Sequence, residues 1–225
     1  MTGPAPYPRI AHLVAGRGSR DDRVLRAAQL GELLAKKVMV EEKLDGANVV
    51  LWGAHHRVEC SLRSGPGAMD RAGQLGRLRA WVAERTDWFH NLLADGRVLY
   101  AEWLYLAHAV HYTSLPEYLI GLDLLRPDGS FLTPDERTDA CGAIGLPVPP
   151  ELWRGMAAGV VSLEALLGQS RWASESAEGI VIRTVDGTEP RIAKLLRPGF
   201  QPLKDGDWKR ARPRNTLADR ETSWH

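Results

Sequence analysis

Residues 42–48 read Glu42-Lys43-Leu44-Asp45-Gly46-Ala47-Asn48, and they follow an apolar run that begins at Val38. The β-branched and apolar residues of that run predict a strand, and the Asp-Gly pair predicts a turn. Such a turn would hold Lys43 at a strand end, with the backbone amides of residues 46–48 placed to bind a phosphate or a ribose. A β-hairpin turn with an exposed lysine has the same tetrapeptide pattern, so other segments must decide between the two interpretations.

Later runs that have the pattern of strands also carry charged residues. They are Glu102 in residues 99–103, Asp123 in 118–125, Glu178 in 178–183 and Lys194 in 192–197. A charge at such a position is costly to bury unless it is paired or binds a ligand. Each one alone would be explained by a structural ion pair. Together they predict a ligand site beside Lys43.

The composition is that of an ordinary soluble globular protein, because 44% of the 225 residues are apolar and 25% are charged. At this length one domain can form a core that needs no disulfide or metal ion. We expect strands at 38–41, 48–52, 57–63, 97–103, 118–125, 179–184 and 191–196, and helices at 23–37, 70–93, 134–144 and 162–167. Strands and helices do not alternate strictly, which predicts the α+β class with mainly antiparallel sheets flanked by helices.

The cysteine content and the apolar runs bear on the compartment. Cys60 and Cys141 are the only cysteines and lie far apart, which excludes a disulfide framework and a CxxC zinc pair. A reducing compartment fits, so we expect a cytoplasmic protein. No apolar stretch approaches the roughly 18 residues of a membrane helix, and the first residues lack a signal-peptide pattern. We therefore expect no membrane partner.

Basic residues gather near the C-terminal end although the net charge is only +1. Eight basic residues against two acidic ones lie between Arg191 and Arg214, with Phe200 and Trp208 among them. Such a stretch could follow a phosphate backbone. A solvated tail is the alternative interpretation.

The order of these runs resembles the covalent nucleotidyltransferases, which include ATP-dependent RNA ligases, DNA ligases and mRNA capping enzymes. In that resemblance the segment around Lys43 is motif I, and the runs with Glu102, Asp123, Glu178 and Lys194 are motifs III, IIIa, IV and V. The likeness is closest to RNA ligases, because Asn48 follows motif I and Arg63 follows in the next strand. The chain ends further resemble short stand-alone bacterial RNA ligases: residues 8–13, Trp208, residues 212–215 and Leu217.

The resemblance implies the nucleotidyltransferase (ATP-grasp-like ligase adenylation) fold and an ATP-dependent polynucleotide ligase, with RNA as the expected substrate. Such an enzyme seals 5′-phosphate and 3′-hydroxyl ends through a lysyl-AMP intermediate, with Lys43 as the nucleophile and Lys194 stabilising the reacting phosphate. The implied ATP-binding residues are Glu42, Lys43, Asp45, Asn48, Arg63, Glu102, Tyr118, Glu178 and Lys194. Glu102 and Glu178 would hold Mg²⁺ or Mn²⁺. The implied nucleic-acid contacts are Arg63, Arg197, Lys204, Lys209 and Arg210.

Attack by Lys43 requires an unprotonated amine, so we expect its pKa to be lowered by Lys194 or by a bound metal ion. Two features depart from the family pattern. Position 196 in motif V is Leu, and strand periodicity places Lys194 and Arg197 on opposite faces. The residue that stacks on adenine is Tyr118 or an aliphatic neighbour such as Leu122.

The resemblance also suggests a division of the chain into a nucleotidyltransferase domain, residues 1–200, and a short basic tail, residues 201–225, with no OB-fold domain. We expect the tail to act after self-adenylation, so that removal of the residues after Gly199 would spare reaction with ATP. The expected partners are RNA, or DNA, with 5′-phosphate and 3′-hydroxyl ends, and a polynucleotide kinase and phosphatase.

Other functions remain open at this point. A DNA ligase or another nucleotidyl transferase would use the same motifs. A nucleic-acid-binding relative without activity is a third possibility, against which the presence of Lys43, Glu102, Glu178 and Lys194 argues. Covalent labelling with α-labelled ATP would separate this relative from the enzymes.

Overall fold

A computed structural model describes residues 3–15, 23–55, 57–63, 73–186, 190–203 and 212–218. In chain order the elements are β1 (Ala11–His12), α1 (Ala27–Leu34), β2 (Lys37–Lys43), β3 (Ala47–Ala54), β4 (Arg57–Leu62), α2 (Gln74–Ala83), α3 (Thr86–Leu93), β5 (Val98–Trp103), β6 (Leu119–Leu125), α4 (Pro134–Gly142), β7 (Glu151–Met156), α5 (Val160–Glu164), β8 (Gly179–Thr184) and β9 (Ile192–Leu196). The α+β class predicted from the sequence is confirmed.

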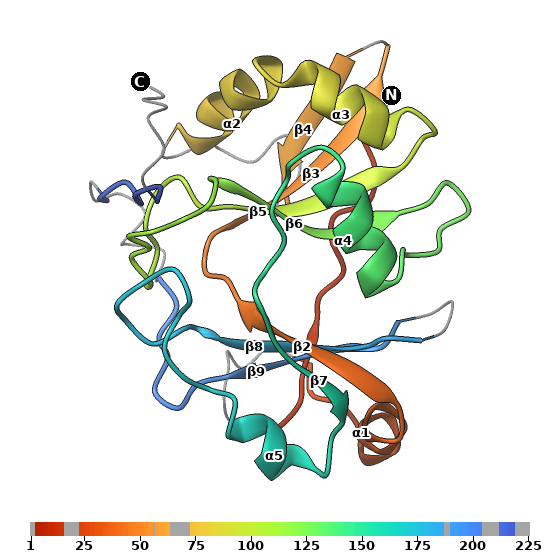
Figure 1. The fold of residues 1–225 in the computed structure, drawn as a ribbon, viewed down its shortest axis with the longest axis vertical. Coiled ribbons are helices and arrows are strands. Elements are labelled where there is room, and N and C mark those ends of the chain that lie inside the picture. The colour runs from red at the N-terminus through yellow and green to blue at the C-terminus, as the bar shows by residue number, and fades with distance from the viewer. Residues whose placement is uncertain are drawn as a thin grey trace.

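The strands form two sheets, one ordered β1-β9-β8-β2-β7 and the other β4-β3-β5-β6. Neighbouring strands are antiparallel except for β1 and β9, which are parallel. The sheets lie as separate layers in Figure 1, with α2 and α3 outside the β3–β6 sheet and α1 and α5 outside the other. Since β2 belongs to one sheet and β3 to the other, residues 44–46 carry the chain from layer to layer.

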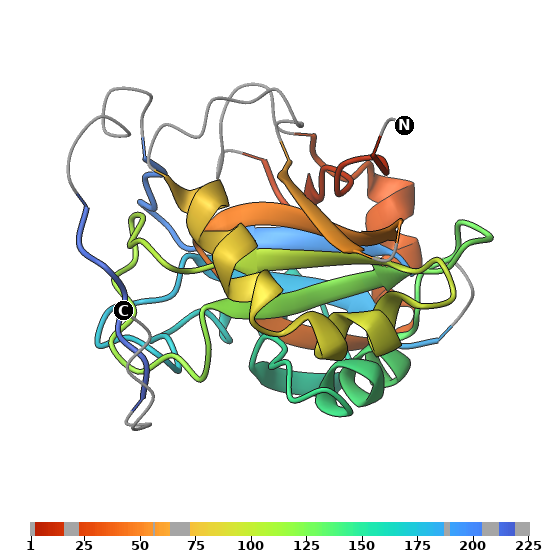
Figure 2. The ribbon, with the colours of Figure 1, turned by 90° about the horizontal axis from the view of Figure 1, so that it is seen from above.

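Aromatic side chains fill the core between α2, α3 and the β4-β3-β5-β6 sheet. Trp81 is fully buried, and its ring centroid lies 6.0 Å from the rings of both Phe89 and Trp103. Burial of each such side chain contributes roughly 1.5–3 kcal/mol to folding. The view from above shows both helices lying across this sheet (Figure 2).

Strand periodicity divides the charged and apolar residues of the other sheet between its two faces. Val38 and Val40 of β2 pack with Ile180 and Ile182 of β8 in the cluster that α1 and α5 cover. Because successive side chains point to opposite faces, Glu41 and Lys43 of β2 face the second sheet. The charged face of this sheet therefore lies in the space between the layers.

The prediction of one continuous helix over residues 70–93 is wrong. The described part of this segment forms two helices, α2 and α3, which are separated at Glu84 and Arg85. The end of α2 tightens, because the Arg85 amide donates to the carbonyl of Val82, three residues back. The Arg85 guanidinium also donates to the Trp81 carbonyl, over a distance of 3.3 Å. The apolar period continues through the break because both helices cover one sheet.

Two of the strands, β1 and β7, were not predicted from the sequence pattern. β7 lies at a sheet edge and is only partly buried, so it lacks a clear apolar alternation. β1 has two residues, and its partner β9 lies far away in sequence. In the described part of the chain, every helix is too short or too polar to span a bilayer.

The predicted boundary at residue 200 separates residues that the structure packs together. Asn215 is 1% exposed, and Leu217 packs against the core under α2 and α3. The Ala107 amide donates to the Pro213 carbonyl at 2.9 Å. Residues 212–218 thus belong to the body of the domain, whereas Lys204, Lys209 and Arg210 lie outside the described residues.

Candidate active site

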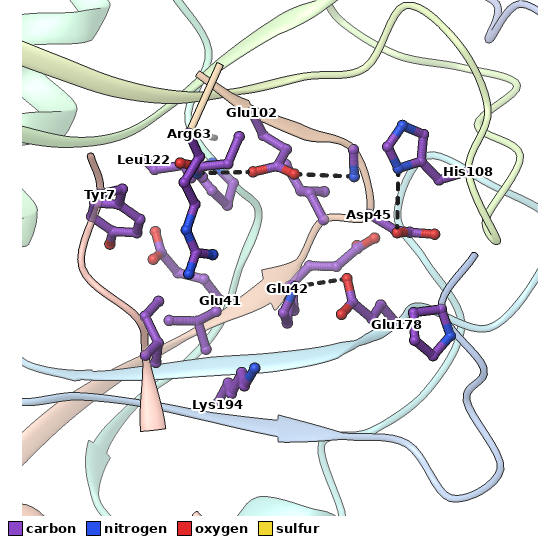
Figure 3. Close-up of a pocket in the computed structure, with 18 of the residues that line it drawn as sticks. Tyr7, Glu41, Glu42, Asp45, Arg63, Glu102, His108, Leu122, Glu178 and Lys194 are labelled. Atoms are coloured by element: carbon purple, nitrogen blue, oxygen red, sulfur yellow. Dashed lines mark hydrogen bonds and ion pairs between the residues drawn. The ribbon is translucent and has the colours of Figure 1, made fainter. Parts of the chain in front are cut away.

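A cavity of about 310 Å³ lies between the two sheets, at the lower end of the range for small-molecule sites, roughly 300–1,000 Å³. Its walls include residues of β2, β8 and β9 from one sheet, of β3, β5 and β6 from the other sheet, and of the 44–46 crossover. Figure 3 shows how these side chains converge from both sheets. The predicted site residues that line the cavity are Glu42, Lys43, Asp45, Asn48, Arg63, Glu102, Glu178 and Lys194.

Lys43 is the last residue of β2 and pairs with Gly179, the first residue of β8. Its Nζ donates a hydrogen bond to Glu178 Oε2 at 2.7 Å. The carboxylate that precedes β8 is thereby brought beside the lysine that ends β2, as motifs I and IV of the resemblance imply. The dashed line that ends on Glu178 in Figure 3 marks this ion pair.

Glu102 lies on β5, and its side chain forms hydrogen bonds with the crossover and the start of β3. Its carboxylate accepts a hydrogen bond from the Gly46 amide at 3.1 Å and one from Asn48 Nδ2 at 3.3 Å. A Cβ on Gly46 would lie 2.5 Å from Leu104 Cδ2 and 2.8 Å from the Trp103 carbonyl oxygen. The glycine of motif I is therefore required for a close approach of two backbones. The hairpin interpretation is wrong, because the strands on either side belong to different sheets.

Asp45 fixes a loop. Its Oδ2 accepts hydrogen bonds from the amides of Ala109, at 2.7 Å, and Val110, at 2.9 Å. His108 Nδ1 lies 3.8 Å from Oδ1 of the same carboxylate. Burial, with Arg212 nearby, lowers the pKa of His108 to about 4, so this contact is not an ion pair at neutral pH. Asp45 therefore shapes the cavity wall through residues 108–110.

Glu42 lines the cavity, but its carboxylate is held away from Lys43. The carboxylate accepts hydrogen bonds from Ser170 Oγ at 2.5 Å and from the Arg171 amide at 2.8 Å. Lys43 and Glu42 thus point to opposite sides of β2, as the strand period predicts. The ATP-binding role of Glu42 stays a prediction, and its carboxylate is already hydrogen-bonded within the protein.

Two predicted residues lie away from the cavity lining. Tyr118 is buried, its ring packs against Tyr105, and its hydroxyl donates to the Asn215 carbonyl at 3.2 Å. Arg197 follows β9, and its guanidinium lies 5.3 Å from the Phe200 ring centre. Leu122, the aliphatic alternative for contact with adenine, does line the cavity. The odd spacing from Lys194 explains the placement of Arg197.

A buried network of ion pairs beside Lys43 was not assigned from the sequence. Arg183 pairs with Glu41 and with Asp123, at 2.7 Å in each case, and Arg137 of α4 pairs with Glu41 at 2.6 Å. The Tyr7 hydroxyl donates to Asp123. These groups join β2 and β8 of one sheet to β6 of the other. The spacing of Glu41 two residues before Lys43 was the available signal, because both side chains then share a face.

The charges around Lys43 act on its pKa in opposite directions. Burial lowers the pKa of Lys43, but the carboxylates of Glu178 and Glu102 outweigh burial and raise it. This result differs from the expectation that neighbouring cations lower this pKa. Without bound ligands, Lys43 is therefore a protonated ammonium group, and its activation requires a change in the charge of the site.

The donor set fits a divalent cation that is shared with a nucleotide. Burial raises the pKa of both Glu102 and Glu178 to about 7, although Lys43 opposes this. Two buried carboxylates suit Mg²⁺, which proteins bind through one or two carboxylates together with substrate phosphates. The described residues include no group of three or more metal-ligating side chains of the His, Cys, Asp and Glu types. A cation at Glu102 and Glu178 would thus need ligands from the nucleotide or water.

These raised pKa values predict how stability changes with pH. Between about pH 5 and 7 the folded protein keeps protons that the unfolded chain releases, so its free energy of unfolding falls as pH rises. We expect Glu178→Gln to reduce this fall by roughly 1–3 kcal/mol. Urea unfolding at several pH values, without nucleotide or divalent cation, measures the difference. The exposed Glu84→Gln is the control, and equal slopes for Glu178→Gln and wild type would contradict the prediction.

Several solved structures share this fold. A Naegleria gruberi RNA ligase variant with ATP and Mn aligns with a TM-score of 0.54 and 16% identity, over 86% of this chain and 61% of that chain. Another variant of that ligase, with AMP and Mn, gives 0.56 and 16%, over 85% and 62%. A putative ATP-dependent DNA ligase from Aquifex aeolicus gives 0.52 and 19%, over 85% and 49%. The chain thus spans about three fifths of the length of the Naegleria ligase.

Comparison of the sequence with protein-family models identifies the family of this chain more specifically than these structural similarities do. No sequence of a curated protein matches the chain. The family model described as RNA ligase matches residues 36–196. The match includes Lys43, Glu102, Glu178 and Lys194, the residues that the structure brings to one cavity. The chain belongs to the RNA ligase family.

Proposed function

We propose that this protein is an ATP-dependent RNA ligase that joins 5′-phosphate and 3′-hydroxyl ends through a lysyl-AMP intermediate on Lys43. The observation that carries the proposal is the position of Lys43, at a strand end between two sheets, with Glu178 at 2.7 Å and Glu102 and Lys194 in the same cavity. Such a placement suits a covalent nucleophile, because side chains on rigid elements surround it.

The reaction requires three displacements at phosphorus. Lys43 Nζ, after losing its proton, forms a bond to the α-phosphorus of ATP while the bond from that phosphorus to pyrophosphate breaks. A 5′-phosphate oxygen of the RNA then takes the AMP and frees Lys43. Finally, the 3′-hydroxyl loses its proton and bonds to the 5′-phosphorus, and AMP leaves.

Residues of the cavity supply charge for these steps. Lys194 lies on the charged face of β9, opposite Val181 of β8, and would stabilise negative charge that develops on the reacting phosphate. Arg63 points from the end of β4 into the cavity (Figure 3) and offers two donors to a phosphate. A divalent cation bound to Glu102 and Glu178 would offset the carboxylate charge that raises the Lys43 pKa, leaving burial, which lowers it.

Substrate, partner and compartment are further parts of the proposal. The RNA ligase family model favours RNA over DNA. A kinase and phosphatase that prepare the RNA ends would supply the 5′-phosphate and 3′-hydroxyl that sealing requires. Both cysteines are free thiols and buried, which fits action in a reducing cytoplasm.

Joining assays test the proposal. A 5′-phosphorylated RNA and a 3′-hydroxyl RNA, incubated with the protein, ATP and Mg²⁺ or Mn²⁺, should give a joined strand and AMP. Matched DNA strands are the comparison. Joining of DNA alone would favour the DNA ligase alternative, and transfer of AMP to the protein without joining of either strand would indicate a different acceptor.

A further inference from the structure

Residues 212–218, which we name the strap, lie against the 104–118 loop that links β5 to β6. Figures 1 and 2 both show the strap, in dark blue, beside this loop. The Leu115 amide donates to the Thr216 carbonyl at 2.9 Å, and the Thr216 amide donates to the Tyr112 carbonyl at 3.0 Å. The loop has no regular strand of its own, so these contacts fix its path.

Asn215 is the buried residue of the strap. Its Oδ1 accepts from the Tyr112 amide at 2.9 Å, and its Nδ2 donates to the Leu104 carbonyl at 2.7 Å. Its own amide donates to the Tyr105 carbonyl at 3.1 Å. Both ends of the side-chain amide are thus used, at a residue that is 1% exposed. Without Asn215, a buried amide and a buried carbonyl would lose their partners.

The same loop also holds the 44–46 crossover, which directly follows Lys43. The Tyr112 hydroxyl accepts a hydrogen bond from the Asp45 amide at 2.9 Å. The Ala109 and Val110 amides donate to the Asp45 carboxylate. Tyr112 therefore contacts Asn215 through its backbone and Asp45 through its side chain. Asp45 lies two residues after Lys43.

We propose that Asn215 is a positioning residue for Lys43, acting through Tyr112 and Asp45. This inference rests on the proposed function, since it concerns the attack of Lys43 on ATP. It reverses the expectation that residues after Gly199 act only after self-adenylation. The strap fixes the position of the 104–118 loop. The loop in turn fixes the 44–46 crossover, and thereby the end of β2 from which Lys43 would reach the nucleotide.

Two variants test the chain of contacts. Asn215→Ala removes both side-chain bonds of the strap, and Tyr112→Phe removes only the hydroxyl that meets Asp45. Asn91→Ala, at an exposed position of α3, and Tyr100→Phe, whose hydroxyl donates to the Ala5 carbonyl, are the matched controls. If Asn215→Ala does not fold, Tyr112→Phe decides the test, because it removes a single atom from the core.

The first measurement is the single-turnover rate of AMP attachment at saturating ATP and Mg²⁺, below the unfolding temperature of each variant. The second is sealing of a pre-adenylated RNA to a 3′-hydroxyl strand without ATP, a step that needs no attack by Lys43. We expect both variants to slow AMP attachment about tenfold or more, while sealing of the pre-adenylated strand changes much less and the controls match wild type.

Two outcomes would overturn the inference. AMP attachment by both variants at the wild-type rate would show that the strap does not position Lys43. An equal loss in both measurements would show that Asn215 and Tyr112 are merely structural. The absence of AMP attachment by wild type would instead refute the proposed function, which separates the two failures.

Discussion

Lys43→Ala is expected to abolish covalent attachment of AMP to the protein, because the variant lacks the Nζ that lies 2.7 Å from Glu178 Oε2 and would form the bond to phosphorus. The loss should exceed what any neighbouring substitution causes, since the nucleophile itself is removed. Incubation with α-labelled ATP and Mg²⁺, followed by denaturing electrophoresis, measures the attachment.

Lys37→Ala is the matched control for this experiment. Lys37 begins the strand that Lys43 ends, and it is exposed. This variant should be labelled as wild type is. Labelling of Lys43→Ala at the wild-type level would show that the nucleophile is a different residue.

Arg183→Met is expected to cause the largest loss of stability among single substitutions near the site. Arg183 is 3% exposed and pairs with both Glu41 and Asp123. Removing one partner of a buried ion pair leaves an uncompensated charge, at a cost of about 3–5 kcal/mol. Urea unfolding at neutral pH measures the change in the free energy of unfolding.

Arg97→Met provides the comparison, because Arg97 pairs at 2.8 Å with Asp95 and both side chains are partly exposed. Surface pairs of this kind contribute about 1 kcal/mol or less. An equal loss for the two variants would contradict the account of the network between the sheets.

The charged positions of the site were predictable because the side chains of a strand alternate between its two faces, so a charged residue within an apolar strand is conspicuous in the sequence. Glu102, Glu178 and Lys194 each lie among apolar residues in the sequence. Their convergence on Lys43 follows from an order of motifs that resembles a known family, and the RNA ligase family model confirms that resemblance. Local pattern and family order together therefore predicted the α+β class and brought Lys43, Glu102, Glu178 and Lys194, which line the cavity, into one predicted site.

Contacts between distant segments were not predictable in the same way. The sequence of the strap is polar and basic, which is typical of a solvated segment. In the structure, however, Asn215 is buried and contacts residues more than one hundred positions earlier in the chain. Tyr118 has an aromatic ring that could stack on adenine, but its side chain is buried in the core. The ion pairs of Glu41 with Arg183 and Arg137 likewise depend on how the two sheets and α4 pack. Periodicity indicates a face and does not identify its partner.

The division between α2 and α3 illustrates a related limit. Both helices cover one sheet, so one apolar period runs through residues 74–93. The break depends on hydrogen bonds of Arg85 to Val82 and Trp81, which leave no apolar signature. Helix boundaries depend on such local bonds more than on the apolar pattern.

The most direct test of the account is to locate the adenylyl group. The wild-type protein, incubated with ATP and Mg²⁺ or Mn²⁺ and then digested, can be analysed by mass spectrometry under conditions that preserve a phosphoramidate. We expect one AMP on the peptide that contains Lys43, attached through Nζ and labile to acid. AMP on any other residue, or a protein that remains unmodified while strands are joined, would contradict it.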